Sequence, residues 1–187
     1  MKLLWLDMET TGLEIKDGHY PLEIGCVVAK NFTESVEEYS SVIKWDAQKT
    51  YFQCIDWCKK AHTENALLYE VENGKPLEIV EQELIDLVQR NFKKGEEVVI
   101  AGNSIGSFDR PYLVKWFPNF EKKLHYRMLD VTSWRMGFVG LKIFENVDKT
   151  KIDHRVMGDL KESIWEFTRY KDFLVRSQML SSVNQPY

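Results

Sequence analysis

The stretch LLWLDMETTG, residues 3–12, ends an apolar run in two carboxylates that are two positions apart. Side chains at positions i and i+2 of a β-strand point to the same face. Asp7 and Glu9 are therefore expected side by side at the end of a buried strand, where each charge raises the pKa of the other. Paired carboxylates suit Mg²⁺ or Mn²⁺, so the stretch predicts a metal site, with two solvated acids at an exposed strand end as the alternative.

Three strand-like segments come first in the chain, with turn-like sequence after the first of them. We expect strands over residues 2–8, 21–30 and 36–44, with Gly12 and Gly18 in the first gap. This arrangement is typical of an antiparallel meander.

The rest of the chain alternates helices and strands after an irregular or helical segment over residues 45–76. The expected elements are a helix over 76–92, a strand over 96–103, a short helix after Asp109, a strand over 126–132 and a last helix over roughly 158–174. Together with the meander they predict an α/β fold, a mixed five-stranded sheet flanked by helices. We expect one domain over residues 1–176 and a polar, loosely packed C-terminal tail over residues 177–187.

Composition limits the classes of protein to which the chain belongs. Its 187 residues, 44% of them apolar, are enough for one full core. No segment approaches the length of a membrane span, and no signal peptide is recognisable. Cys26, Cys54 and Cys58 form no regular framework, which predicts reduced thiols in a cytoplasmic protein.

The charge of the chain bears on its substrate. The formal net charge is −4 and the isoelectric point is about 5.7. Proteins that grip long nucleic acids usually carry a basic surface. The composition therefore favours a small anionic substrate that is held by metals and by a few local contacts.

Three further polar residues stand at the starts of expected helices. Asp109 follows the apolar strand and the GNSIGSF loop, and His154 and Asp159 flank the start of the last helix. Each has an ordinary alternative interpretation. Asp109 fits a helix N-cap, His154 an exposed loop residue, and Asp159 a favourable charge at a helix N-terminus.

Taken together, these residues form a recognisable order: Asp-x-Glu on the first strand, an Asp that opens a mid-chain helix, and His-x₄-Asp at the last helix. This order resembles the DEDDh family of 3′-to-5′ exonucleases, which have a ribonuclease-H-like fold, and more specifically the oligoribonucleases. The resemblance extends from about residue 2 to residue 175. It is carried by WLDMETTGL (5–13), DWCKKAHT (56–63), AGNSIG (101–106), LHYRMLDVTS (124–133) and HRVMGDLKES (154–163).

The resemblance implies a role for each catalytic position. Asp7, Glu9 and Asp159 would hold one of two divalent cations, Mg²⁺ or Mn²⁺. Asp7 would bridge to the second cation, with Asp109 helping through water. His154 would act as general base on the attacking water. Two cations about 3.5–4 Å apart would clamp the attacking and leaving oxygens of a phosphodiester.

The resemblance also implies substrate contacts. Leu13 and Trp57 match the apolar pair that wedges the terminal bases, and stacking on Trp suits an enzyme that tolerates any base. Plain core packing is the alternative for Trp57. The remaining matches form a polar cap on the 5′ phosphate: Ser104, Tyr126, Arg127, Thr132 and Ser133.

The cap implies an assembly and a substrate length. Tyr126 and Arg127 would come from the partner subunit of a homodimer, so each active site would be completed by the partner. Such a cap would select very short RNA, 5′-phosphorylated dinucleotides above all. It would also explain how an acidic protein binds RNA without tracking a long backbone.

Two departures from the oligoribonuclease pattern stand out. The chain has one residue more between Asn103 and Asp109, and Val156 stands where a small residue is usual and is expected to crowd the helix start. His62 lies in a matching stretch without an assigned role. Two other functions stay open at this point: a general DEDDh exonuclease on longer single strands of RNA or DNA, and an inactive nucleic-acid-binding module.

Overall fold

A five-stranded mixed sheet forms the centre of the computed structural model, which describes residues 1–145 and 154–183. The strands are β1 (Leu3–Thr10), β2 (Pro21–Lys30), β3 (Glu34–Val42), β4 (Ile100–Gly102) and β5 (Met128–Asp130), in the order β3-β2-β1-β4-β5. β1 to β3 pair antiparallel, and β4 and β5 run parallel to β1. The predicted fold class, including the meander, is confirmed.

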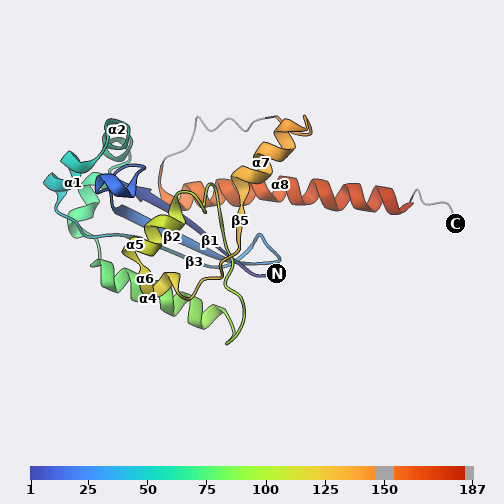
Figure 1. Cartoon of the computed structure of the whole chain (residues 1–187), viewed down its shortest axis with the longest axis horizontal. Helices are drawn as coiled ribbons and strands as arrows, with labels where there is room; N and C mark the ends of the chain where they lie inside the picture. The colour runs from blue at the N-terminus through green and yellow to red at the C-terminus, as the bar shows by residue number, and fades with distance from the viewer. Residues whose placement is uncertain (146–153, 184–187) are drawn as a thin grey trace.

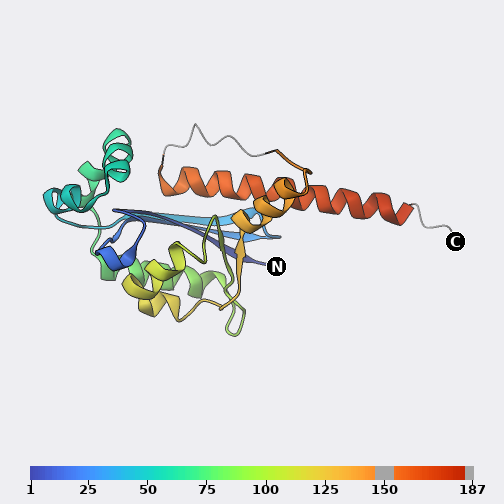
Figure 2. The same ribbon diagram turned by 45° about the horizontal axis from the view of Figure 1, so that its top comes forward.

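Helices cover both faces of the sheet and one of its ends (Figure 1). One face carries α4 (Leu77–Asn91), α5 (Asp109–Trp116) and α6 (Pro118–Glu121), and the other carries α8 (Val156–Val183), with α7 (Val131–Gly140) beside it (Figure 2). The short helices α1 (Ala47–Gln53), α2 (Asp56–Glu64) and α3 (Leu67–Glu70) gather at the end of the sheet where β1 stops. Single 3₁₀ turns complete the set: η1 (Ile15–Asp17) and η2 (Val71–Asn73).

The two-residue period of β1 decides which face of the sheet receives its acids. Leu4, Leu6 and Met8 belong to the core under α4, α5 and α6. Leu3 and Trp5 belong instead to the core under α8, together with residues of that helix. Asp7 and Glu9 continue this second face. The two acids therefore meet the start of α8 rather than the helices on the opposite side.

The start of α8 packs tightly on β2. Val156 is fully buried, and a Cβ built on Gly25 would lie only 2.7 Å from its Cγ2. The crowding that we expected at Val156 is relieved because Gly25 leaves this space free. Leu160, one turn further along α8, would approach the same Cβ to 3.0 Å.

Several expected boundaries differ from the observed ones. The strands predicted over 96–103 and 126–132 are shorter, because β4 and β5 each have three residues. Asp130 ends β5 by accepting a hydrogen bond from the backbone N–H of Ser133 at 3.1 Å, which caps α7, a helix that the sequence did not predict.

α8 is also longer than expected. It continues to Val183, so the helix extends into the segment that we expected to be a polar tail, while residues 184–187 lie outside the described part of the chain. Nothing in the sequence stops the helix earlier, since no Gly follows Gly158 and the next Pro after the start of the helix is Pro186.

The cysteines are all free and buried. Burial raises the pKa of Cys54 to about 11 and that of Cys58 to about 12, so both are neutral thiols at physiological pH. Within the described residues, no helix combines the length and the apolar character needed to cross a membrane.

Candidate active site

A cleft of about 210 Å³ opens at the carboxyl end of β1. Four of the five predicted catalytic residues line it: Asp7, Glu9, His154 and Asp159. The remaining lining residues are Met8, Thr10, Leu13, Trp57, Cys58 and Phe108. The fold thus brings the first strand, α2, the loop before α5 and the start of α8 to one place.

Glu9, His154 and Asp159 form the tightest part of the cleft. Each offers one potential ligand atom, and these atoms all lie within 4.8 Å of one another. β1 supplies Glu9, and α8 supplies Asp159 in its first turn, with His154 two residues before the helix. The two carboxyl groups offer the oxygen ligands that a hard divalent cation prefers, and the imidazole nitrogen lies close to both of them.

The electrostatics of Glu9 indicate what is needed to ionise it. Its pKa is raised to about 10, first by burial and then by the charges of Asp7 and Asp159. Without a cation, Glu9 therefore holds a proton at neutral pH. A divalent cation between these carboxyl groups would reverse that preference, so the residues fit the metal that the family pattern implies.

Asp109 lies deeper than the other acids. It opens α5 and is only 1% exposed, and burial followed by the charge of Asp7 raises its pKa well above the ordinary value. Its Oδ1 has no hydrogen-bond partner among the described residues. The loop that has one additional residue still places Asp109 at the start of α5. The Phe108 N–H donates to the Ser104 carbonyl at 2.9 Å, which forms a turn directly before the helix.

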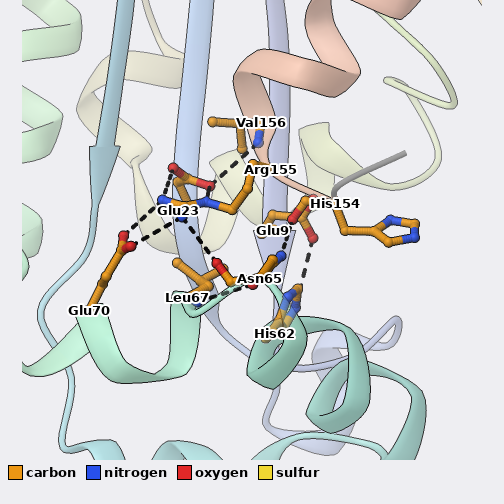
Figure 3. A network of polar contacts seen from close by, with 9 residues as sticks. All are labelled: Glu9, Glu23, His62, Asn65, Leu67, Glu70, His154, Arg155 and Val156. Carbon is orange, nitrogen blue, oxygen red and sulfur yellow. Dashed lines mark hydrogen bonds and ion pairs between the residues drawn. The ribbon is translucent and has the colours of Figure 1, made fainter. Parts of the chain in front are cut away.

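His62 supports Glu9 from beneath (Figure 3). It is fully buried on α2, its Nε2–H donates to the Thr10 carbonyl at 3.0 Å, and the same nitrogen lies 3.7 Å from a Glu9 oxygen. Burial lowers the pKa of His62, so the ring is neutral. His62 therefore fixes the end of β1 without adding a positive charge to the site.

Two exposed apolar side chains stand at the rim of the cleft. Leu13 is 64% exposed and Trp57 is 55% exposed, so the core-packing alternative for Trp57 is wrong. The Trp57 ring lies edge-on to the His154 ring, with centroids 4.9 Å apart. The loop that carries Leu13 is fixed from behind, because the Tyr112 hydroxyl donates to the Gly12 carbonyl at 2.8 Å.

The residues of the predicted phosphate cap fall into two groups. Ser104 and Thr132 share a hydrogen bond of 3.2 Å between their hydroxyls, and Thr132 Oγ1 also accepts from Ser104 N–H at 3.0 Å. Arg127 and Ser133 line a separate hollow of about 510 Å³, and Tyr126 is 67% exposed beneath the guanidinium of Arg127. Neither Tyr126 nor Arg127 belongs to the described lining of the cleft at Asp7.

The chain was compared with known proteins. Residues 4–167 match the family described as Exonuclease. The chain is 32% identical over 181 residues to an oligoribonuclease of Francisella tularensis subsp. tularensis, covering 92% of this chain and 96% of the relative. This chain belongs to the oligoribonuclease family. A probable oligoribonuclease of Schizosaccharomyces pombe is 31% identical over 91% of this chain and 68% of the relative.

Solved structures with the same fold include a larger exonuclease. Exonuclease I of E. coli, in complex with a dT13 oligonucleotide, superposes with a TM-score of 0.64 at 13% sequence identity. The alignment covers 93% of this chain but only 43% of exonuclease I. A further complex of that enzyme, with a 5cy-dT13 oligonucleotide, gives a TM-score of 0.65 at 11% identity. At these identities the likeness concerns only the fold.

Some residues around the site of this oligoribonuclease family member were not singled out by sequence reasoning. They are Glu23, Asn65, Glu70 and Arg155, which form a polar network beside His154 (Figure 3). Of these four residues, Glu23 could have been noticed in the sequence, because it is an acid inside a strand that is otherwise largely apolar. The antiparallel register of the sheet pairs it with Glu9. The other three join segments that are distant in the sequence.

Proposed function

We propose that this protein hydrolyses very short RNA from the 3′ end, with 5′-phosphorylated dinucleotides as its preferred substrates and two divalent cations, Mg²⁺ or Mn²⁺, as its cofactors. Membership of the oligoribonuclease family makes the chain a 3′-to-5′ exoribonuclease, a phosphodiester hydrolase. One observation carries the proposal: Asp7, Glu9, His154 and Asp159 line the same small cleft as the exposed side chains of Leu13 and Trp57.

The side chains divide the work of phosphodiester hydrolysis. A water oxygen attacks the phosphorus, the bond to the 3′ oxygen breaks, and a nucleoside 5′-monophosphate is released. His154 accepts the proton of the attacking water, and solvent protonates the departing 3′ oxygen. Asp7, Glu9 and Asp159, assisted by Asp109, would hold the cations. When bound, the cations would neutralise the negative charge that develops on the phosphoryl oxygens.

The rim of the cleft supports a short, base-tolerant substrate. Leu13 and Trp57 offer apolar faces to terminal bases, and every base can stack on an indole. The hydroxyls of Ser104 and Thr132, which bond each other, are the groups that we propose to bind a 5′ phosphate. The backbone of Ser104 bonds to that of Phe108, a lining residue of the cleft. A net charge of −4 also argues against tracking along a long backbone.

We extend the proposal to a homodimer in which the partner's residues equivalent to Tyr126 and Arg127 complete each cap. The position of these residues outside the cleft of their own chain supports this arrangement. Exposed apolar side chains on α7, directly after it and on α8 support burial of this region against another surface: Met136 (71%), Leu141 (73%) and Trp165 (51%). The three buried free thiols support a cytoplasmic location, and the family match over residues 4–167 supports one domain over residues 1–176.

Turnover of 5′-labelled RNAs, from the dinucleotide to the decanucleotide, tests the proposal. Rates would be measured with Mg²⁺, with Mn²⁺ and with a chelator. We expect the dinucleotide to be hydrolysed fastest and the chelator to abolish hydrolysis. Arg127→Ala should greatly reduce activity on the 5′-phosphorylated dinucleotide. Equal rates on all lengths, together with an unaffected Arg127→Ala variant, would contradict the preference for short RNA.

His154→Ala tests the general base separately. Removing the proton acceptor should lower kcat by about 10²- to 10⁴-fold, the usual contribution of general base catalysis. Affinity for Mg²⁺ or Mn²⁺, measured by calorimetry, should stay close to that of the unsubstituted protein. Because the imidazole lies within 4.8 Å of Glu9 and Asp159 ligand atoms, a large loss of metal affinity would identify His154 as a ligand instead.

A further inference from the structure

His154 adopts a backbone conformation that a residue with a side chain rarely adopts. Its φ is +51°, in the left-handed region. For a residue other than Gly this conformation costs roughly 1 kcal/mol or more, so it persists only where the surroundings hold it. The direction in which the imidazole leaves the backbone depends on this conformation. Whatever holds the backbone therefore also aims the ring into the cleft.

Asn65 makes the closest described contact with that backbone. Its side-chain Nδ2 donates to the His154 carbonyl oxygen at 2.6 Å, across 89 residues of sequence. Its Oδ1 accepts from the Leu67 backbone N–H at 3.0 Å, which fixes the orientation of the amide. Asn65 is the C-cap residue of α2, the helix that carries Trp57 and His62. The amide thus connects the rim and floor of the cleft with His154.

Arg155, the residue that follows His154, is held in place by its own side chain (Figure 3). Its guanidinium binds Glu23 on β2 through two hydrogen bonds of 2.9 Å and Glu70 on α3 at 2.8 and 3.2 Å. It also lies within 3.5 Å of the Asn65 carbonyl oxygen. Two carboxylates on a planar, bidentate guanidinium form a directional clamp. The backbone on the C-terminal side of His154 is therefore fixed independently of its imidazole.

We propose that Asn65 is a positioning residue for His154: its amide, supported by the Arg155 clamp, holds the left-handed backbone that aims the imidazole at the attacking water. This inference rests on the proposed role of His154 as general base. It adds a residue that is not part of the described lining of the cleft and that would act through His154. Its loss should therefore slow the chemical step and leave substrate binding intact.

The first test compares two substitutions of Asn65. Asn65→Asp keeps the shape and the acceptor for Leu67 but removes the amide donor, and Asn65→Leu removes the donor without adding charge. With a saturating 5′-phosphorylated dinucleotide, each should lower kcat by about 10- to 100-fold, the cost of a misplaced catalytic group, while KM changes less than about twofold. The matched control is Asn91→Leu, which removes the amide bonds to the Leu87 carbonyl and to Glu37 at the end of α4 and should leave kcat unchanged.

The decisive test repeats Asn65→Leu in the His154→Ala background. If Asn65 acts only through the imidazole, the second substitution should have no further effect on the residual rate. Equal losses of kcat in both backgrounds, or a raised KM with unchanged kcat, would overturn the positioning role. A His154→Ala variant with full activity would instead contradict the general base itself, so the two failures are distinguishable. Circular dichroism on each folded variant verifies that the loss is not unfolding.

Discussion

Glu9 and Asp109 are buried carboxyl groups whose pKa values the fold raises. Burial is the first cause of the raised pKa of both, and the charge of Asp7 is the second. The charge of Asp7 therefore contributes to the raised pKa of both Glu9 and Asp109. Removal of Asp7 and removal of Glu9 should consequently have different effects on stability, although both should damage the metal site.

Asp7→Ala should abolish hydrolysis and leave the fold intact. Asp7 is proposed to bridge both cations, and its charge raises the pKa of two neighbours in the metal-free protein. The midpoint of thermal unfolding in the presence of a chelator should therefore stay the same or rise. An active Asp7→Ala variant would contradict the role of Asp7 as a metal ligand. A sharply destabilised variant would contradict the unfavourable interaction of Asp7 with Glu9 and Asp109 in the metal-free protein.

Glu9→Gln should change how stability depends on pH. Between the ordinary pKa of 4.5 and about 10, the folded protein keeps a proton on Glu9 that the unfolded chain releases. The free energy of unfolding of the metal-free protein should therefore fall as pH rises through this window, and Glu9→Gln should make that fall shallower. Urea unfolding at several pH values, with a chelator present, measures the slope.

The control for this measurement is Glu14→Gln, because Glu14 is an exposed acid close to the same strand. Its slope should match that of the unsubstituted protein. Added Mg²⁺ should stabilise the unsubstituted protein more at high pH than at low pH, since the cation binds ionised Glu9. Identical slopes for Glu9→Gln and the unsubstituted protein would refute the buried, protonated state.

At the scale of elements, the active site depends on how α8 meets the sheet. The helix carries Asp159, follows His154 directly and begins against Gly25 of β2. Further along, Glu166 of α8 is fully buried and paired with Arg135 of α7, and the Tyr170 hydroxyl donates to Glu166 at 2.6 Å. Arg135 also donates to Asn103 at 2.6 Å, which connects α7 and α8 with the end of β4.

Gly25→Ala should displace the start of α8. The added methyl group would lie 2.7 Å from Val156 Cγ2 and 3.0 Å from Leu160 Cδ1. Overpacking of this kind costs about 1–3 kcal/mol, and the shift would move Asp159 and His154 relative to Glu9. Stability from urea unfolding and the dinucleotide rate should therefore both fall. Val156→Gly in the same chain removes both the Cγ2 and the Cβ, which would lie 2.9 Å from the added methyl group, and should restore part of both. Failure to do so would show that the contact does not set the helix position.

At the scale of the whole molecule, the proposed catalytic cleft is separate from the hollow that Arg127 and Ser133 line in the same chain. In a twofold dimer, each surface patch meets its own counterpart, and two equivalent sites result. Arg127 suits the role of a contributed residue, because a guanidinium binds phosphate through two parallel hydrogen bonds. A chain that lacks its partner should therefore bind a dinucleotide weakly.

Subunit mixing tests this assembly. Asp7→Ala and Arg127→Ala homodimers should each be nearly inactive on a 5′-phosphorylated dinucleotide. In the mixed dimer, one site combines an intact metal centre with an intact cap and the other has neither, so about half the unsubstituted activity per dimer should return. Mixing Asp7→Ala with itself gives the control without recovery. A monomer in light scattering, or no recovery in the mixed dimer, would contradict the shared cap.

The sequence by itself determined the meander, the mixed sheet and the common face of Asp7 and Glu9. These follow from local apolar spacing and from the two-residue period of a strand, which do not depend on distant contacts. The motif order also identified the cleft-lining acids and the rim residues Leu13 and Trp57. Such features are predictable because they lie within short, continuous segments.

Only the tertiary structure decided which distant side chains meet around them. Asn65 reaches His154 across 89 residues, Arg155 reaches Glu23 across 132, and Gly25 makes room for Val156. The physical reason is that a contact between segments distant in the chain depends on the packing of the whole core, which no local period encodes.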